Sequence, residues 1–185
     1  MPKVTYLSYY DIINEQKARS FMEACAQAIA QTNPDQLYFL FSSSGGSVDA
    51  GISIYNFLRA LPVPIVMHNT GSIDSIANVI FLAADERWAA PQAGFLFHGI
   101  NWGFGQGATL AWTQLQEVVS NFKAAETRVI AIIKERTALS EGEIAALFHQ
   151  GESKDLAFAK SKGIIKDVRP AKVPPGATLV ALNFA

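Results

Sequence analysis

Short apolar runs alternate with longer stretches of helical spacing along the first half of the chain. The apolar runs resemble strands buried on both faces of a sheet, and they lie at residues 4–9, 37–41, 65–68, 88–90 and 95–97. The stretches between them predict helices over residues 14–31 and 49–60 and a third helix that begins at about Ser75. Since repeated strand–helix–strand units connect by right-handed crossovers, the pattern predicts an α/β fold with a mainly parallel sheet.

The second half of the chain is mostly helical. A long helical pattern covers about residues 108–137. Ser140 and Glu143 have the spacing of a capping box, which predicts a further helix to about residue 148. One more helix covers about residues 154–162 and ends at Gly163, a residue type that commonly terminates helices.

Length and composition indicate one globular unit with a short appendage. The 185 residues are 50% hydrophobic, which is enough to form one sizeable core. We expect a single domain over residues 1–168 and an extended, proline-containing tail over residues 169–185. Within the tail, residues 178–184 are expected to form either an edge strand of the sheet or an arm onto a neighbouring subunit.

Charge and cysteine content limit the classes of binding partner and the cellular compartment that the sequence predicts. With 15 basic and 16 acidic residues, the chain lacks the basic excess that binds nucleic acid or anionic lipid. Neither a signal peptide nor an apolar stretch of about 20 residues is visible, which predicts a soluble, cytoplasmic protein with no membrane partner. The lone Cys25 cannot form an internal disulfide and fits a packed position in a reducing compartment.

Residues with chemical potential follow successive predicted strands. Gly45 and Gly46 come after a buried strand, and glycines there allow backbone N–H groups to approach a ligand closely. Ser75 follows the next strand, and His98 ends a later one. Because the carboxyl ends of parallel strands lie on one edge of a sheet, these residues can share a site in which His98 is the base for Ser75. Taken by itself, Ser75 is more simply interpreted as a helix N-cap.

Other candidate residues are assigned structural roles. His68 ends a strand and His149 lies near a helix end, and we expect both to be structural. The glycine-rich segment at residues 103–107 lacks the full spacing of a dinucleotide-binding loop and the lysine of a phosphate-binding loop. It is therefore expected to be a hinge or flexible loop, and no cofactor or metal is predicted.

Several segments, taken in order, resemble the motifs of the Clp protease proteolytic subunit (ClpP), a serine peptidase family within the ClpP/crotonase superfamily. The similarity includes S-S-G-G-S-V-D-A-G-I-S-I-Y after the second strand and F-L-F-H around His98. It spans about residues 6–168, and the matching segments lie at residues 43–55, 71–84, 91–98, 106–108 and 159–167.

This resemblance implies a fold, a reaction and a set of site residues. The fold is the ClpP/crotonase-like arrangement of repeated βαβ units. The reaction is endopeptidase cleavage through an acyl-enzyme, in which Ser75 attacks the peptide carbonyl and His98 accepts its proton. The backbone N–H groups of Gly46 and Ile76 are the implied oxyanion hole, and no metal or cofactor is needed.

The resemblance also implies an assembly and partners. The long helix at residues 108–137 corresponds to the protruding handle helix through which the family's rings stack. We therefore expect a homo-oligomeric ring or stacked rings that act on peptides or unfolded proteins inside a chamber. Docking of a Clp-type ATPase is implied less strongly, because the family's contact segment ahead of the first strand is short here.

Two positions depart from the family pattern. The family's catalytic aspartate falls on Gly151, and the neighbouring Glu152 is the candidate third member that orients His98. Loss of the third member costs up to about 10⁴-fold in other triads. Asp74 stands directly before Ser75, where the family usually has alanine; we expect it to cap the following helix rather than to face the site.

Three classes of function stay open. The leading one is an active ClpP-like serine peptidase. The second is a catalytically weak or inactive ClpP homologue with a structural or regulatory role in a ring, motivated by Gly151. The third is a crotonase-type acyl-CoA enzyme, which uses the same fold but needs no serine at position 75. A peptidase with a Ser/Lys dyad is disfavoured because no lysine lies near the motifs.

Overall fold

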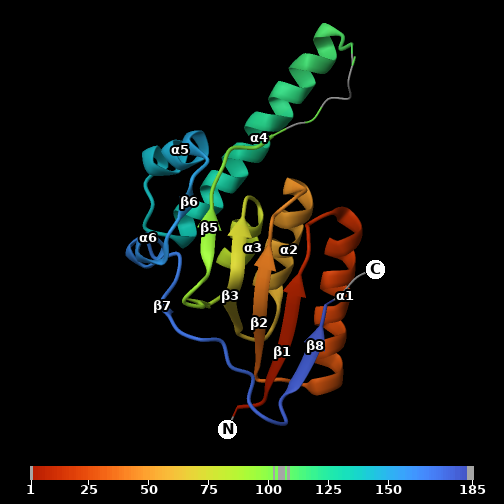
Figure 1. Ribbon diagram of the computed structural model, residues 1–185. Coiled ribbons are helices and arrows are strands. Elements are labelled where there is room, and N and C mark those ends of the chain that lie inside the picture. The colour runs from red at the N-terminus through yellow and green to blue at the C-terminus, as the bar shows by residue number, and fades with distance from the viewer. Residues whose placement is uncertain (1, 102, 104–106, 108, 183–185) are drawn as a thin grey trace.

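The computed structural model describes residues 2–101, 103, 107 and 109–182. Within this part of the chain, one sheet has the order β6-β5-β3-β2-β1-β8, with β4 paired to β3 and β7 to β4 (Figure 1). Its pairs are parallel except β5 with β6, which confirms the mainly parallel sheet. The strands are β1 (Val4–Tyr10), β2 (Gln36–Ser43), β3 (Ile65–Asp74), β4 (Glu86–Ala89), β5 (Gly94–Leu96), β6 (Ser153–Lys154), β7 (Asp167–Val168) and β8 (Thr178–Ala181).

The helices cover one face of the sheet and one end of it. Helices α1 and α2 lie against the same face, whereas the first half of α4 protrudes from the body (Figure 1). The second half of α4 contributes buried Val129 and Ile133 to the core. Among the described residues, no helix is long and apolar enough to cross a bilayer. The helices are α1 (Glu15–Thr32), α2 (Val48–Ala60), α3 (Ala77–Leu82), α4 (Trp112–Arg136), α5 (Glu141–Gln150) and α6 (Leu156–Ser161).

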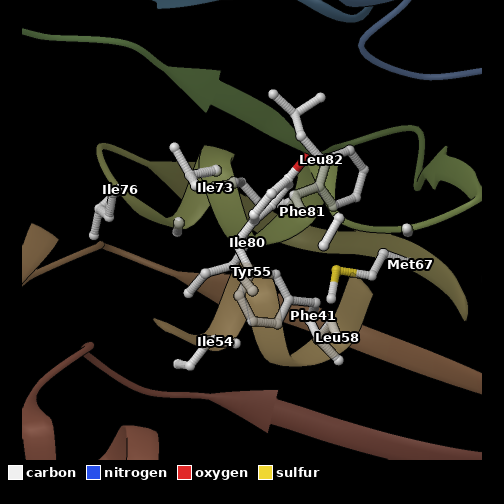
Figure 2. Packing of buried hydrophobic residues seen from close by; sticks show 14 of the residues in the cluster. Phe41, Ile54, Tyr55, Leu58, Met67, Ile73, Ile76, Ile80, Phe81 and Leu82 are labelled. Atoms are coloured by element: carbon white, nitrogen blue, oxygen red, sulfur yellow. The ribbon is translucent and has the colours of Figure 1, made fainter. Parts of the chain in front are cut away.

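The core lies between the sheet and the helices. In the part shown in Figure 2, Phe41 and Met67 from the sheet gather with Tyr55 and Leu58 of α2 and Phe81 of α3. Every residue of α3 is buried. Full burial of a large apolar side chain contributes about 1.5–3 kcal/mol relative to exposure. The packing of its buried side chains therefore holds α3 firmly in place after the carboxyl end of β3.

The structure corrects two predicted boundaries. Strand β3 runs on past residue 68 to Asp74, because after pairing with β2 and β4 it pairs again with β5 through Ser72 to Asp74. The helix expected to begin at about Ser75 begins instead at Ala77, which leaves Ser75 in the turn.

The structure describes part of the C-terminal tail and most of the long helix. Thr178–Ala181 forms β8, a parallel edge strand on β1, so the edge-strand alternative describes this part of the tail. The handle helix runs over Trp112–Arg136. Residues 104–106, 108 and 183–185, which include parts of the glycine-rich segment, the G-Q-A match and the tail, lie outside the described residues.

Arg87 and Arg136 donate hydrogen bonds to carbonyl oxygens at the carboxyl ends of α3, α4 and α6. Arg87 is half-buried, and the loss of hydration lowers the pKa of its guanidinium to about 10. Arg136 at the end of α4 donates to two of the same region's carbonyls. Between them, the two guanidinium groups donate at 2.8–3.1 Å to the carbonyl oxygens of Leu82, Ala84, Arg136, Gly163 and Ile164. These bonds satisfy carbonyls that helix ends leave unpaired, and they join the foot of α4 to the end of α3.

His68 fastens the segment after β7 to the sheet. Its Nε2 lies 3.0 Å from the carbonyl oxygen of Arg169, and its Nδ1 lies 2.7 Å from the hydroxyl of Tyr38. Because a carbonyl can only accept, Nε2 carries the proton and Nδ1 accepts from Tyr38. Burial of the ring lowers the pKa of His68 below its ordinary value of 6.5. The neutral imidazole is therefore the folded form.

Acidification is expected to destabilise the fold through His68. Since the pKa of His68 is lowered on folding, the unfolded chain binds the proton more readily. The stabilisation is complete above pH 6.5 and is lost as the pH falls below that value toward the folded pKa. The pKa of Glu143, lowered to about 2 by Lys162 and Ser140, places its titration well below this range. Urea unfolding of wild type at about pH 7.5 and about pH 5.5 measures the loss.

The matched variant is His68→Gln, which is polar but does not titrate. It should unfold with a much weaker dependence on pH over the same range. An equally steep dependence in His68→Gln would show that other groups cause it.

Candidate active site

A cavity of about 240 Å³ opens at the carboxyl ends of β2, β3 and β5. Its wall brings together Gly46, Ser75 and His98, which the predicted strand ends grouped, and Ile76, which the family resemblance added. The full lining is Ser44, Gly46, Val48, Ser75, Ile76, Phe97, His98, Ile100, Asn101, Val129, Ile133 and Phe148. Most of these side chains are apolar, and the polar ones are those of Ser44, Ser75, His98 and Asn101.

Ser75 occupies a strained elbow between β3 and α3. Its φ of 56° lies in the left-handed region, which costs a residue other than glycine about 1–3 kcal/mol. Its N–H donates to the Leu96 carbonyl at 2.9 Å, and its carbonyl accepts from the N–H of Asn78 at 3.1 Å. The hydroxyl has no hydrogen-bond partner among the described residues. The elbow therefore presents a free hydroxyl to the cavity.

The Gly45-Gly46 turn lies directly against this elbow. A Cβ on Gly45 would come within 2.7 Å of the Ser75 Cβ, and one on Gly46 would come within 2.0 Å of the Ile13 carbonyl oxygen. Both φ values are positive, 87° and 146°. Only glycine fits either position.

Two backbone N–H groups at this contact are available to a ligand. Ile13 bonds to the neighbours of Gly46, since its N–H donates to Gly45 and its carbonyl accepts from Ser47, both at 2.8 Å. This pattern leaves the Gly46 N–H without a partner among the described residues, and the same holds for the Ile76 N–H. Two such donors at the wall of a cavity are what an oxyanion hole requires.

His98 is oriented by main-chain groups. Its Nδ1 lies 2.6 Å from the carbonyl oxygen of Gly99, whose own N–H donates to the Phe148 carbonyl of α5 at 3.0 Å. Since a carbonyl only accepts, Nδ1 carries the proton in the neutral ring and Nε2 keeps its lone pair. No hydrogen bond joins His98 to Ser75 in the described structure; such contacts are often long before substrate binds. The tautomer is the one that a general base needs.

The structure does not bring Glu152 to His98. The carboxylate of Glu152 pairs with Lys154 at 3.3 Å, and its side chain is 66% exposed. Asp155, the next carboxylate along the chain, caps α6 through the N–H of Phe158. Gly151 does lie beside the histidine: a Cβ there would sit 4.0 Å from the His98 Cβ. The position expected of the third member is thus next to His98 but has no side chain.

The expectation that Asp74 caps the following helix is wrong. Helix α3 has no side-chain cap, and the Asp74 carboxylate instead accepts a short hydrogen bond from the Ser72 hydroxyl. Asp74 is not among the residues that line the cavity. Its charge is therefore directed at a neighbour on its own strand.

A second cavity, of about 490 Å³, continues from the first and shares Gly46, Val48, Ile100 and Asn101 with it. It extends along α4 toward Arg128, which pairs with Asp49 at 2.8 Å. No group of three or more potential metal ligands is present in the described part of the chain.

Comparison with known proteins shows which family this chain is similar to. The family model for Clp protease matches residues 3–172. The chain belongs to the Clp protease family. Proteolytic subunit 2 from Borreliella burgdorferi is 25% identical over 162 residues, covering 86% of this chain and 80% of that protein. A ClpP1 variant from Listeria monocytogenes matches with a TM-score of 0.76 at 19% identity, covering 90% of this chain and 92% of that one, which confirms the ClpP-like fold.

Matches to other Clp proteolytic subunits are shorter. Subunit 2 from Pseudomonas aeruginosa is 28% identical over 88 residues, covering 46% of this chain and 43% of that protein. Subunit 2 from Treponema denticola is 26% identical over 121 residues, covering 64% and 58%. The chain thus spans about half the length of these two relatives.

Sequence reasoning missed two groups at the site of this Clp family member. The Gly99 carbonyl that accepts from His98 is a backbone group, so the residue type at position 99 gives no sign of this role. The side chain of Asn78, in α3, donates to the Ser75 carbonyl. The one sign of it in the sequence is that a polar residue interrupts an apolar run.

Gly45→Ala is expected to disturb the elbow and lower the free energy of unfolding by about 2 kcal/mol or more, because the new Cβ meets Ser75 and the backbone must keep a positive φ. Gly94→Ala is the matched control, since a Cβ there meets nothing within 4 Å. Urea unfolding of both variants measures the difference. Equal stability of the two variants would contradict the close contact.

Proposed function

We propose that this Clp family member is a serine endopeptidase that cleaves peptides or unfolded proteins through an acyl-enzyme. The observation that carries the proposal is the convergence of Ser75, His98 and the free N–H groups of Gly46 and Ile76 on one cavity. Family membership supports the same reaction class.

The reaction begins with attack of the Ser75 Oγ on the substrate carbonyl carbon while Nε2 of His98 takes the hydroxyl proton. The N–H groups of Gly46 and Ile76 stabilise the oxyanion of the tetrahedral intermediate; one such donor is worth about 10²–10³ in kcat elsewhere. The C–N bond then breaks, and His98 returns the proton to the leaving amine. Water, deprotonated by the same ring, hydrolyses the ester and restores Ser75.

The Gly99 carbonyl takes over the orienting part of the third member's role in this proposal. It holds the Nδ1 proton and so keeps Nε2 free as the base. A carbonyl is a neutral dipole, so it stabilises the imidazolium less than a carboxylate does. We therefore infer a slower acylation than in a complete Ser-His-Asp triad.

The cavity wall favours an apolar substrate side chain next to the scissile bond. Val48, Phe97, Val129, Ile133 and Phe148 supply this wall. A charged side chain would lose its hydration there without gaining a partner. Substrates with a large apolar residue at this position should therefore be preferred.

A homo-oligomeric ring, or two stacked rings, belongs to the same proposal. The first half of α4 exposes Trp112, Leu115 and Val119, spaced to share one helix face. An exposed apolar face of this kind is typical of a surface that another subunit covers. Delivery of substrate by a Clp-type ATPase and a cytoplasmic location are inferred from family membership.

A catalytically weak ring component is the second candidate function. It is favoured by Gly151, which leaves the position beside His98 without a carboxylate. The crotonase-type alternative receives no such support, because the family model that matches is that of Clp protease.

Labelling with a fluorophosphonate tests the leading proposal. Wild type should be labelled, Ser75→Ala should not, and His98→Ala should react about 10²- to 10⁴-fold more slowly. Glu152→Gln is a matched control that should label like wild type, because Glu152 pairs with Lys154. Labelling that survives in Ser75→Ala would refute the nucleophile. An unlabelled wild type that still elutes as a ring would favour the weak ring component.

Gly151→Asp is expected to raise the labelling rate about tenfold or more, because a carboxylate beside His98 stabilises the imidazolium. The φ of 60° at this position is one that Asp and Asn tolerate. Gly151→Asn is therefore the control with the same backbone cost and no charge. Equal rates in the two variants would show that the missing carboxylate is not what limits the reaction.

A further inference from the structure

Asn78 connects the nucleophile segment to the strand that leads to His98. The residue is 1% exposed and lies in α3 among apolar neighbours. Its side-chain amide lies 3.0 Å from the Ser75 carbonyl oxygen and 2.8 Å from the Leu96 carbonyl oxygen. Because both neighbours can only accept, the atom that faces them is Nδ2. Leu96 also accepts from the Ser75 N–H, so one side chain ties the elbow to β5.

The same bond determines where the Ile76 N–H points. The Ser75 carbonyl accepts from both the backbone N–H and the side-chain Nδ2 of Asn78, at 3.1 Å and 3.0 Å. In a planar trans peptide the C=O of one residue and the N–H of the next point in opposite directions. Holding the Ser75 carbonyl toward Asn78 therefore turns the Ile76 N–H away from Asn78. Ile76 is one of the residues that line the cavity.

Asn78 also carries a cost that an apolar residue would avoid. Its Oδ1 is buried and has no hydrogen-bond partner among the described residues. An unsatisfied buried acceptor loses its hydration without compensation. A leucine at this position would continue the apolar run of α3 without that cost, but it would free the Ser75 carbonyl from Nδ2.

We propose that Asn78 is a positioning residue that orients the Ile76 N–H as an oxyanion donor and holds the Ser75 elbow against β5. This inference rests on the proposed peptidase reaction at the same site. Asn78 itself touches no substrate atom; it acts through the Ser75–Ile76 peptide. Its loss should therefore slow the chemical step and leave substrate binding nearly unchanged.

The test compares Asn78→Ala with Asn69→Ala. Asn69 is a matched control, because it is also fully buried and its Nδ2 donates to another carbonyl of β5, that of Gly94, at 2.8 Å. Asn78→Ala should lower kcat on a fluorogenic peptide about 10- to 100-fold with KM within about twofold of wild type. The fluorophosphonate labelling rate should fall in parallel. Asn69→Ala should keep kcat within about twofold of wild type even where its melting temperature falls as far.

Equal losses of kcat in the two variants, or an unchanged kcat in Asn78→Ala, would overturn the proposal. If Asn78→Ala does not fold, the nearly isosteric Asn78→Asp replaces it. As a protonated acid that side chain has one donor in place of two, so its kcat should also fall. Wild-type kcat in Asn78→Asp would overturn the proposal.

A crystal structure of the Asn78 variant separates this inference from the proposed function. A rotated Ser75–Ile76 peptide is expected, and an unmoved peptide would refute the positioning role even if wild type proves inactive. A wild type that never reacts at Ser75 would instead refute the peptidase.

Discussion

The site depends on a backbone contact that leaves no room for side chains. Gly45 and Gly46 lie between the chain at Ile13 and the Ser75 elbow, and a single Cβ on either glycine would collide with one of them. The available N–H groups, the elbow and the carbonyl that holds His98 are all main-chain features. Side chains of the core matter to the proposed chemistry mainly because they press these backbone segments together.

Helix α3 is held at both ends. At its start, Asn78 and Leu96 hold the Ser75 elbow, and at its end the guanidinium groups of Arg87 and Arg136 hold the last carbonyls. Arg136 belongs to α4, so the foot of the handle is joined by hydrogen bonds to the helix that follows the elbow. Rigid support of this kind is what a residue with a strained backbone needs in order to persist.

Periodicity and parallel topology predicted most of the fold and the grouping of the site. The ends of parallel strands share an edge whatever their sequences, which is why Gly46, Ser75 and His98 were expected together. The hydrogen-bond partner of His98 was not predictable from residue types, because it is the backbone carbonyl of Gly99. Glu152, the expected partner, pairs with Lys154 instead. The overlong β3 escaped prediction as well, since its polar second half pairs with β5 without apolar alternation.

The edge strand β8 has a consequence for the order in which the sheet is completed. Thr178 pairs with Thr5, so one edge of β1 is covered by residues that leave the ribosome long after β1 itself. Until they emerge, the nascent chain carries an open strand edge that can pair with other chains. Closing so large a loop is slow as well as late, and the sheet is therefore most exposed to aggregation while the protein is still being made.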